Sequence, residues 1–222
     1  MGLNMKKMKI FGLVLIVLSI VILSGCTAPQ KTQDTQYNGT NQVKTLSEIP
    51  DNAKKLLGID PLGNDTDGDG EDDMNDSTPT FVDVPPQAST GSVGFRIQNI
   101  IVENNYDEVA KKDAPDHLEL VLQSITNKDI HNMTVYYIIT DTKINKTESY
   151  IKPLSGFVLK ANETRTIHFD AGQKPDHFRA NPNSIYYTTK DELNFTVTIN
   201  VDGYAAQTIQ VKKDAGGAEA PD

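Results

Sequence analysis

The stretch that determines the fold class reads Leu193-Asn194-Phe195-Thr196-Val197-Thr198-Ile199-Asn200-Val201-Asp202-Gly203. Apolar and polar residues alternate along it, so Phe195, Val197 and Ile199 share one face, as in a half-buried β-strand. Asp-Gly then separates this run from a second one, Tyr204 to Lys212, and favours a tight β-hairpin between them. The stretch therefore predicts an antiparallel sheet with one buried row of side chains.

Similar runs recur upstream, each with apolar residues at about every second position: Phe95 to Val102 with one offset, Leu118 to Gln123, Met133 to Ile139, Ser149 to Ile151, Gly156 to Leu159, Thr164 to Phe169 and Ile185 to Thr188. Clusters of Asn, Asp, Gly and Pro separate them, and a helical period of useful length is missing. Residues 91–213 are therefore expected to form a mainly β domain, an antiparallel immunoglobulin-like β-sandwich. With one Cys and no Trp, the antibody type is excluded. The pattern resembles the sandwiches repeated on prokaryotic surface proteins.

A second informative stretch is Asp65-Thr66-Asp67-Gly68-Asp69-Gly70-Glu71-Asp72-Asp73-Met74-Asn75-Asp76. With Asp65 as position one, Asp67, Asp69, Glu71, Asp73 and Asp76 stand at positions three, five, seven, nine and twelve, from which an EF-hand-type loop supplies oxygen ligands. Gly70 stands at position six, where the chain turns sharply and a Cβ would obstruct it. A hard cation prefers oxygen, and these carboxylates repel one another until a cation neutralises them. The spacing predicts Ca²⁺ bound by Asp65, Asp67, Asp69, the Glu71 carbonyl, Asp73 and Asp76.

The flanks of this loop exclude a paired EF-hand sensor. Downstream, Ser77-Thr78-Pro79-Thr80 cannot begin a long helix, and upstream a turn or two of helix is predicted over Asn52 to Leu57 before Gly58. Without a partner loop, the ion itself must order the segment, so we expect a dissociation constant of about 10⁻⁴ to 10⁻³ M. We also expect a β domain that does not depend on the loop.

The run Gly58-Ile59-Asp60-Pro61-Leu62, followed by Asp65 to Gly70, resembles thrombospondin type 3 repeats, as found in secreted and cell-surface prokaryotic proteins. The resemblance covers about residues 56–80. It implies calcium binding by the Asp residues and says nothing of a partner or reaction. Asp76, where a sensor has Glu, and Asp72, at a position that is usually apolar, depart from the EF-hand pattern.

The N-terminus predicts export. Residues 1–25 combine a short basic region with an apolar run from Ile10 to Leu23, as in a secretory signal peptide. The run ends Leu23-Ser24-Gly25-Cys26, which resembles a lipobox. Lipidation of Cys26 would explain why an exported protein has one cysteine and no disulfide partner. The alternative is an uncleaved membrane helix, although the run is short for a full span. Either reading tethers the protein to the outer face of the cell membrane.

Composition divides the remaining chain into segments. Residues 26–46 comprise the lipidated cysteine and a polar stretch that predicts a flexible stalk. Residues 47–81 hold the short helix and the calcium loop, residues 82–90 form a Pro-rich linker, and residues 214–222 a disordered tail. The formal net charge is −9, and loss of the first 25 residues, which carry three Lys and no acid, makes it −12. Such a protein is a poor candidate for binding nucleic acid or anionic lipid.

Asn-x-Ser/Thr acceptors are frequent, and those in the β domain are predicted to lie in turns or on outward strand faces, where glycosylation could reach them. Such acceptors also arise simply because Asn and Thr suit exposed turns and strand faces. An archaeal cell surface would fit their number. The acceptors are Asn38, Asn64, Asn75, Asn132, Asn145, Asn162 and Asn194.

The sequence holds no recognised catalytic constellation. A nucleophile elbow, a phosphate loop, a dinucleotide fingerprint and an HExxH motif are all missing, so enzymatic activity is not expected. Four histidines have acidic residues or polar turns nearby, but their spacing does not predict a transition-metal site: His117, His131, His168 and His177.

These features together predict a non-catalytic, calcium-binding, lipid-anchored surface protein. It would present its β-sandwich to an unidentified envelope protein or surface ligand, for adhesion or cell-envelope assembly. The alternative is an accessory subunit that delivers a ligand to a membrane transporter or enzyme complex.

Overall fold

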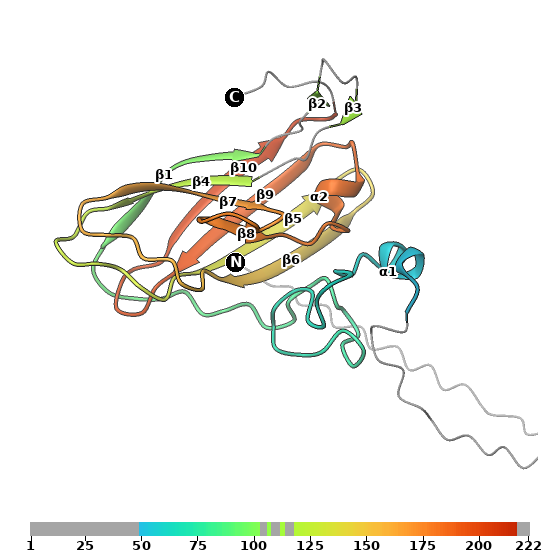
Figure 1. Ribbon diagram of the computed structural model, residues 1–222, viewed down its shortest axis with the longest axis horizontal. Helices are drawn as coiled ribbons and strands as arrows, with labels where there is room; N and C mark the ends of the chain where they lie inside the picture. The colour runs from blue at the N-terminus through green and yellow to red at the C-terminus, as the bar shows by residue number, and fades with distance from the viewer. Residues whose placement is uncertain (1–48, 103–105, 108–111, 114–117, 217–222) are drawn as a thin grey trace, which may run out of the picture. The chain divides into compact units, whose positions relative to one another are not determined.

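The computed structural model describes residues 49–102, 106–107, 112–113 and 118–216 (Figure 1). The predicted signal peptide, Cys26, the stalk and the acceptor Asn38 lie outside these residues, as do residues 217–222 of the predicted tail. Within the described part of the chain, no helix has the length and hydropathy needed to span a membrane.

The first sheet has four strands in the order β1-β4-β7-β8. They are β1 (Phe95–Val102), β4 (Leu118–Ser124), β7 (Thr164–Asp170) and β8 (His177–Arg179). The pairs β1/β4 and β4/β7 are antiparallel, whereas β8 joins β7 in parallel. The predicted offset in β1 is a register shift between Ile97 and Asn99, which indicates a β-bulge.

The second sheet also has four strands, in the order β10-β9-β5-β6, and all its pairs are antiparallel. They are β10 (Gln207–Lys213), β9 (Leu193–Asn200), β5 (Thr134–Asp141) and β6 (Lys146–Pro153). Phe195, Val197 and Ile199 form a buried row on β9, which confirms the prediction from their alternation. A separate two-stranded sheet pairs β2 (Tyr106–Asp107) with β3 (Lys112–Asp113).

Both four-stranded sheets contribute to one hydrophobic core. Leu120 comes from the first sheet and Val135 from the second, and both are fully buried. Tyr137 of β5 meets Phe169 of β7 with ring centroids 5.8 Å apart. The protein is therefore mainly β, as predicted, although the parallel pair β7/β8 makes one sheet mixed where the sequence indicated an antiparallel one.

Two runs predicted as strands have other structures. Ile185–Thr188 is the short helix α2, because the Glu148 carboxylate of β6 accepts a hydrogen bond of 2.8 Å from the amide of Ile185, and the Ser184 carbonyl accepts the amides of Tyr187 and Thr188 at 3.1 Å each. The run over residues 156–159 forms only an isolated bridge between Leu159 and Ile130. Long-range contacts override the short alternation in both runs.

Residues 58–82, here called the acidic segment, pack against the edge strand β6. They follow the helix α1 (Asp51–Leu57), which ends at Gly58 as predicted. The amide of Ile151 donates to the carbonyl of Asp67 (2.6 Å), and the amide of Ser149 donates to the carbonyl of Thr80 (3.0 Å). Outward N–H groups of an edge strand need acceptors, and here the segment supplies them. The segment thus belongs to the same compact unit as the sheets, whereas the sequence predicted a loop independent of them.

Part of the predicted linker is also attached to the β domain. The amide of Ser89 donates to the side-chain oxygen of Asn200 (2.9 Å), and the hydroxyl of Ser89 accepts the amide of Val201 (3.1 Å). These bonds place the end of the linker beside the turn that joins β9 to β10 (Figure 1).

Candidate metal centre

Three carboxylates of the acidic segment converge. Asp65, Asp67 and Asp69 each offer one potential ligand oxygen, and these oxygens lie within 4.8 Å of one another. The carboxylate of Asp65 accepts the amides of Gly68 (2.8 Å) and Gly70 (3.0 Å), so the chain turns around it. Carboxylate oxygens in a tight turn are the donors that a hard divalent cation prefers.

Asp67 is the most enclosed of the three. Its side chain is fully buried; one oxygen accepts the amide of Asp69 (3.1 Å), and among the described residues Oδ2 has no hydrogen-bond partner. Burial raises the pKa of Asp67 to about 7; the Asp69 amide opposes this shift, and the charges of Asp69, Asp76 and Asp65 add to it. A buried carboxylate surrounded by carboxylates is costly unless a cation compensates it, so the residues present fit a metal ion.

Two glycines shape this turn for different reasons. At Gly70 φ is +99°, and a Cβ there would meet nothing within 4 Å. Gly70 is therefore favoured by its backbone conformation rather than by the steric obstruction that the sequence suggested. At Gly68 φ is +82°, and a Cβ would lie 2.2 Å from the carbonyl oxygen of Ile151. The close approach of the loop to β6 requires glycine at this position.

The carboxylates of two other predicted ligands, Asp73 and Asp76, lie outside the converging group. The carboxylate of Asp73 accepts hydrogen bonds from the amide (2.7 Å) and the hydroxyl (2.8 Å) of Thr66. Burial raises the pKa of Asp73, although these two hydrogen bonds act to lower it. Asp76 accepts the amide of Thr78 (2.7 Å), and Oδ2 of Asp76 has no hydrogen-bond partner within the described residues. The side chain of Glu71 is exposed, and the backbone carbonyl of Glu71 stays a predicted ligand. Asp76 is thus a candidate for a further ligand, since the charge of Asp76 adds to the raised pKa of Asp67.

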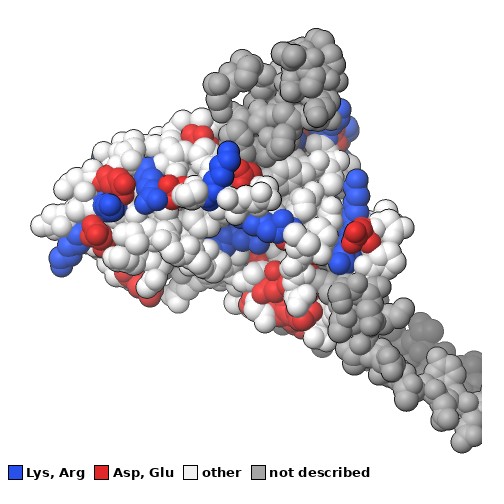
Figure 2. All heavy atoms as spheres, viewed as in Figure 1, with Lys and Arg blue, Asp and Glu red and all other residues white. Residues whose placement is uncertain are grey.

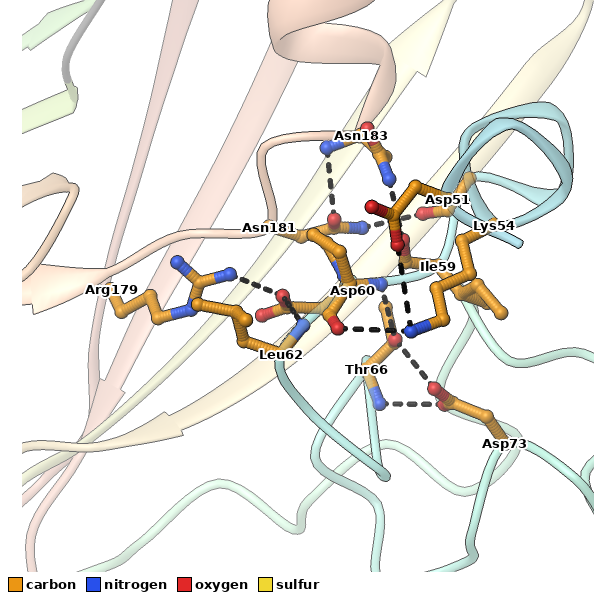
Figure 3. Close-up of polar contacts among 12 residues, drawn as sticks. Asp51, Lys54, Ile59, Asp60, Leu62, Thr66, Asp73, Arg179, Asn181 and Asn183 are labelled. Carbon is orange, nitrogen blue, oxygen red and sulfur yellow. Dashed lines mark hydrogen bonds and ion pairs between the residues drawn. The ribbon is translucent and has the colours of Figure 1, made fainter. Parts of the chain in front are cut away.

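Side chains from the region after β7 hold the start of the acidic segment (Figure 3). Arg179, the last residue of β8, pairs with the buried carboxylate of Asp60. Asn181 donates to the carbonyl of Gly58 and Asn183 to that of Ile59, both at 2.7 Å. Sequence reasoning missed these residues, because more than 100 positions separate the partners and no local pattern connects them.

Basic groups lie beside the carboxylates. Figure 2 shows acidic side chains gathered where the acidic segment lies in Figure 1, next to a row of basic ones. Burial lowers the pKa of Lys152 on β6, and Arg179 adds to this shift, whereas Asp60, Asp65 and Asp67 oppose it. Lys152 therefore lies within electrostatic range of two of the candidate metal ligands.

Two histidines that the sequence did not connect lie side by side. His168 of β7 and His177 of β8 stack with ring centroids 4.5 Å apart and planes at 14°. Nδ1 of His177 lies 2.6 Å from a carboxylate oxygen of Asp170. His131 is exposed in a loop before β5, and His117 lies outside the described residues.

The acceptor asparagines of the described residues are accessible, with one partial exception. Asn64, Asn75, Asn132, Asn145 and Asn162 are exposed, whereas Asn194 on β9 is half-buried. Asn132 precedes β5 with φ of +55° and is not on a strand face as predicted. Asn145 and Asn162 lie in turns, as predicted, with φ of +54° and +57°.

The likeness of this chain to known proteins is a weak structural one. No protein-family model and no curated protein sequence matches it. Solved structures with some likeness include a structural genomics target, SoR45 (TM-score 0.36, 11% identity, covering 60% of this chain and 95% of that one). Others are the sporulation control protein Spo0M from Bacillus subtilis (0.33, 9%, 56% and 50%) and a β-glucosidase involved in saponin metabolism from intestinal bacteria (0.32, 12%, 54% and 16%). Scores this low do not relate the chain's function to theirs.

Proposed function

We propose that this chain is a non-catalytic, calcium-binding surface protein, exported and held at the membrane by a lipid on Cys26. It presents an immunoglobulin-like β-sandwich to an envelope protein or surface ligand, for adhesion or cell-envelope assembly. The observation that carries the proposal is the convergence of Asp65, Asp67 and Asp69 around a buried carboxylate oxygen without a hydrogen-bond partner among the described residues.

Calcium suits these residues better than magnesium or a transition metal. All the converging donors are carboxylate oxygens, which favour a hard cation over the softer metals that select His and Cys. Calcium accepts six to eight oxygens in flexible geometry, whereas magnesium demands a near-ideal octahedron. Asp65, Asp67 and Asp69 would hold the ion, and Asp76 is the additional carboxylate close enough to act on the same group.

The metal proposal is tested by calorimetric titration of the whole chain with Ca²⁺ and with Mg²⁺. We expect Ca²⁺ to bind and Mg²⁺ to bind more weakly, and both Asp65→Asn and Asp69→Asn to abolish binding. Asp72→Asn is the matched control, because Asp72 is exposed in the same segment and its carboxylate accepts only the local amide of Met74 (3.2 Å) among the described residues. Equal loss in all three variants would indicate a diffuse charge effect and not a site.

The anchor is tested separately by Cys26→Ser. If Cys26 carries lipid, this variant is released from membranes or accumulates as the uncleaved precursor. A variant that is processed normally and stays fully membrane-bound would exclude the lipid anchor while leaving the metal site untouched.

A further inference from the structure

We infer that Arg179, Asn181 and Asn183, three residues of the β domain, are positioning residues that set the affinity of the proposed metal site. The inference rests on the proposed function, because it concerns the affinity of the same site. None of the three belongs to the converging carboxylate group. They act through the backbone of the acidic segment.

The first link runs from Arg179 to the ligands through two residues (Figure 3). The guanidinium of Arg179 pairs with the carboxylate of Asp60, and the amide of Asp60 donates to the hydroxyl of Thr66 (2.8 Å). Thr66 stands between Asp65 and Asp67 in the sequence, so a fixed Thr66 fixes the backbone that carries both ligands. Arg179 therefore controls where the carboxylates lie without touching them.

The same threonine ties the two ends of the loop together. Its amide and hydroxyl donate to Asp73, and the amide of Asp73 donates in turn to the carbonyl of Asn64 (2.7 Å). Asp60, Thr66 and Asp73 are at most 9% exposed, so water competes little for these bonds. The network makes the loop a rigid unit that moves with Asp60.

Further contacts attach this unit to both four-stranded sheets. Asn181 and Asn183, which follow β8 of the first sheet, bond the carbonyls of Gly58 and Ile59. On the other side, Ile151 of β6 in the second sheet bonds the carbonyl of Asp67. The acidic segment thus spans from one sheet's outer strand to that of the other.

This attachment changes the energetics of metal binding. An isolated loop must be ordered by the ion, but here hydrogen bonds to the β domain already hold the carboxylates together against their repulsion. Preorganisation removes part of the entropic cost of binding. We therefore expect a dissociation constant below about 10⁻⁴ M, whereas isolated weak modules have dissociation constants of about 10⁻⁴ to 10⁻³ M. By reciprocity, the ion must stabilise the contact between segment and sheets by the same factor.

The experiment measures Ca²⁺ affinity of the whole chain in detergent, with terbium luminescence as a second probe. We expect Arg179→Met to weaken binding by about tenfold and Asn183→Ala by a few-fold, within the usual range of coupling between sites. Arg179→Lys, which keeps the charge, should restore part of the affinity. The matched control is Arg165→Met, because Arg165 of β7, in the same sheet as Arg179, makes a comparable ion pair with Asp176 (2.6 Å), which lies outside the acidic segment. The control should lower the melting temperature and leave the affinity unchanged.

Each result decides the question. The inference fails, and the proposed function stands, if the wild type binds Ca²⁺ and both variants bind it with the same affinity. The two variants are Arg179→Met and Asn183→Ala. If Arg165→Met weakens binding as much as Arg179→Met, the effect is general destabilisation and the inference also fails. If Arg179→Met does not fold, Asn183→Ala, which removes one hydrogen bond, decides alone. A wild type that binds no Ca²⁺ at millimolar concentration overturns the proposed function itself.

Discussion

The amide of Ile151 donates a hydrogen bond of 2.6 Å to the carbonyl of Asp67, so the residue that carries the buried carboxylate is also bonded to the edge strand β6. One residue therefore belongs to both the candidate metal site and the margin of a sheet. Changes at the carboxylate should be felt by the sheet, and changes at the sheet margin by the site.

Asp67→Asn should abolish Ca²⁺ binding and stabilise the metal-free protein. The asparagine side chain keeps the shape of Asp67 and an oxygen that accepts the backbone N–H of Asp69. It removes a buried negative charge that the neighbouring carboxylates repel. We expect a gain of about 1–3 kcal/mol in the free energy of unfolding at neutral pH in chelator. Calorimetric melting with and without Ca²⁺ measures both effects. A metal-free variant less stable than the metal-free wild type would contradict this reading of Asp67.

The metal-free protein should lose stability as pH rises towards neutrality. Burial raises the pKa of Asp67 from 3.8 to about 7 and also raises that of Asp73, so between about pH 4 and pH 7 the folded state binds more protons than the unfolded chain. This contribution is complete below pH 3.8 and is lost as pH passes about 7. Urea unfolding in chelator across this range measures the slope, and Asp67→Asn should flatten it. If the free energy of unfolding instead rises with pH over this range, and Asp67→Asn removes that rise, the pKa of Asp67 is not raised.

Gly68→Ala and Gly70→Ala should differ sharply although both glycines have positive φ. Alanine at Gly70 faces open space, so it costs only the backbone strain, about 1–2 kcal/mol. Alanine at Gly68 must also displace the Ile151 carbonyl, so it should cost more than about 3 kcal/mol and weaken Ca²⁺ binding. Chemical denaturation and calcium titration of the two variants provide the comparison. Equal effects would show that the loop approaches β6 less closely.

Lys152→Met should strengthen Ca²⁺ binding. The ammonium of Lys152 interacts with Asp65 and Asp67, so it competes with the ion for the same negative charge. Loss of one charge at partial screening is worth on the order of 1 kcal/mol, or roughly a three- to tenfold gain in affinity. Lys212→Met is a suitable control, because Lys212 pairs with Glu192 on an exposed surface. Unchanged affinity in Lys152→Met would place the ammonium outside the field of the site.

The sequence predicts the strands well where alternation is long. The rows on β4, β5 and β9 follow directly from it. The predicted pairing of β9 with β10 is also present, but β10 begins at Gln207 and not at Tyr204, so residues 201–206 connect the strands in place of a tight turn at Asp202-Gly203. The prediction fails at Ile185–Thr188, since α2 depends on Glu148, 37 positions away, and on Lys213, which donates to the carbonyls of Tyr186 and Thr189. The alternation of apolar and polar residues over these four positions does not reveal such long-range contacts.

The candidate site is predictable in part for a similar reason. Spacing alone indicates Asp65, Asp67 and Asp69, because carboxylates at alternate positions of a tight, glycine-rich turn are expected to lie close together, as they do here. Spacing does not show that Asp73 is hydrogen-bonded to Thr66. A carboxylate that binds a metal and one that accepts hydrogen bonds from Thr66 have the same sequence. The attachment through Arg179 depends on tertiary structure entirely.

The carbonyls of Asp67 and Thr80 accept hydrogen bonds from outward N–H groups of β6, so these groups cannot pair with another chain. A bare strand margin is a template on which another chain can pair, and proteins protect such margins to avoid aggregation. The acidic segment covers this one and surrounds it with negative charge. A chain lacking residues 58–82 would present unpaired N–H groups of β6, and we expect it to self-associate by strand pairing at high concentration.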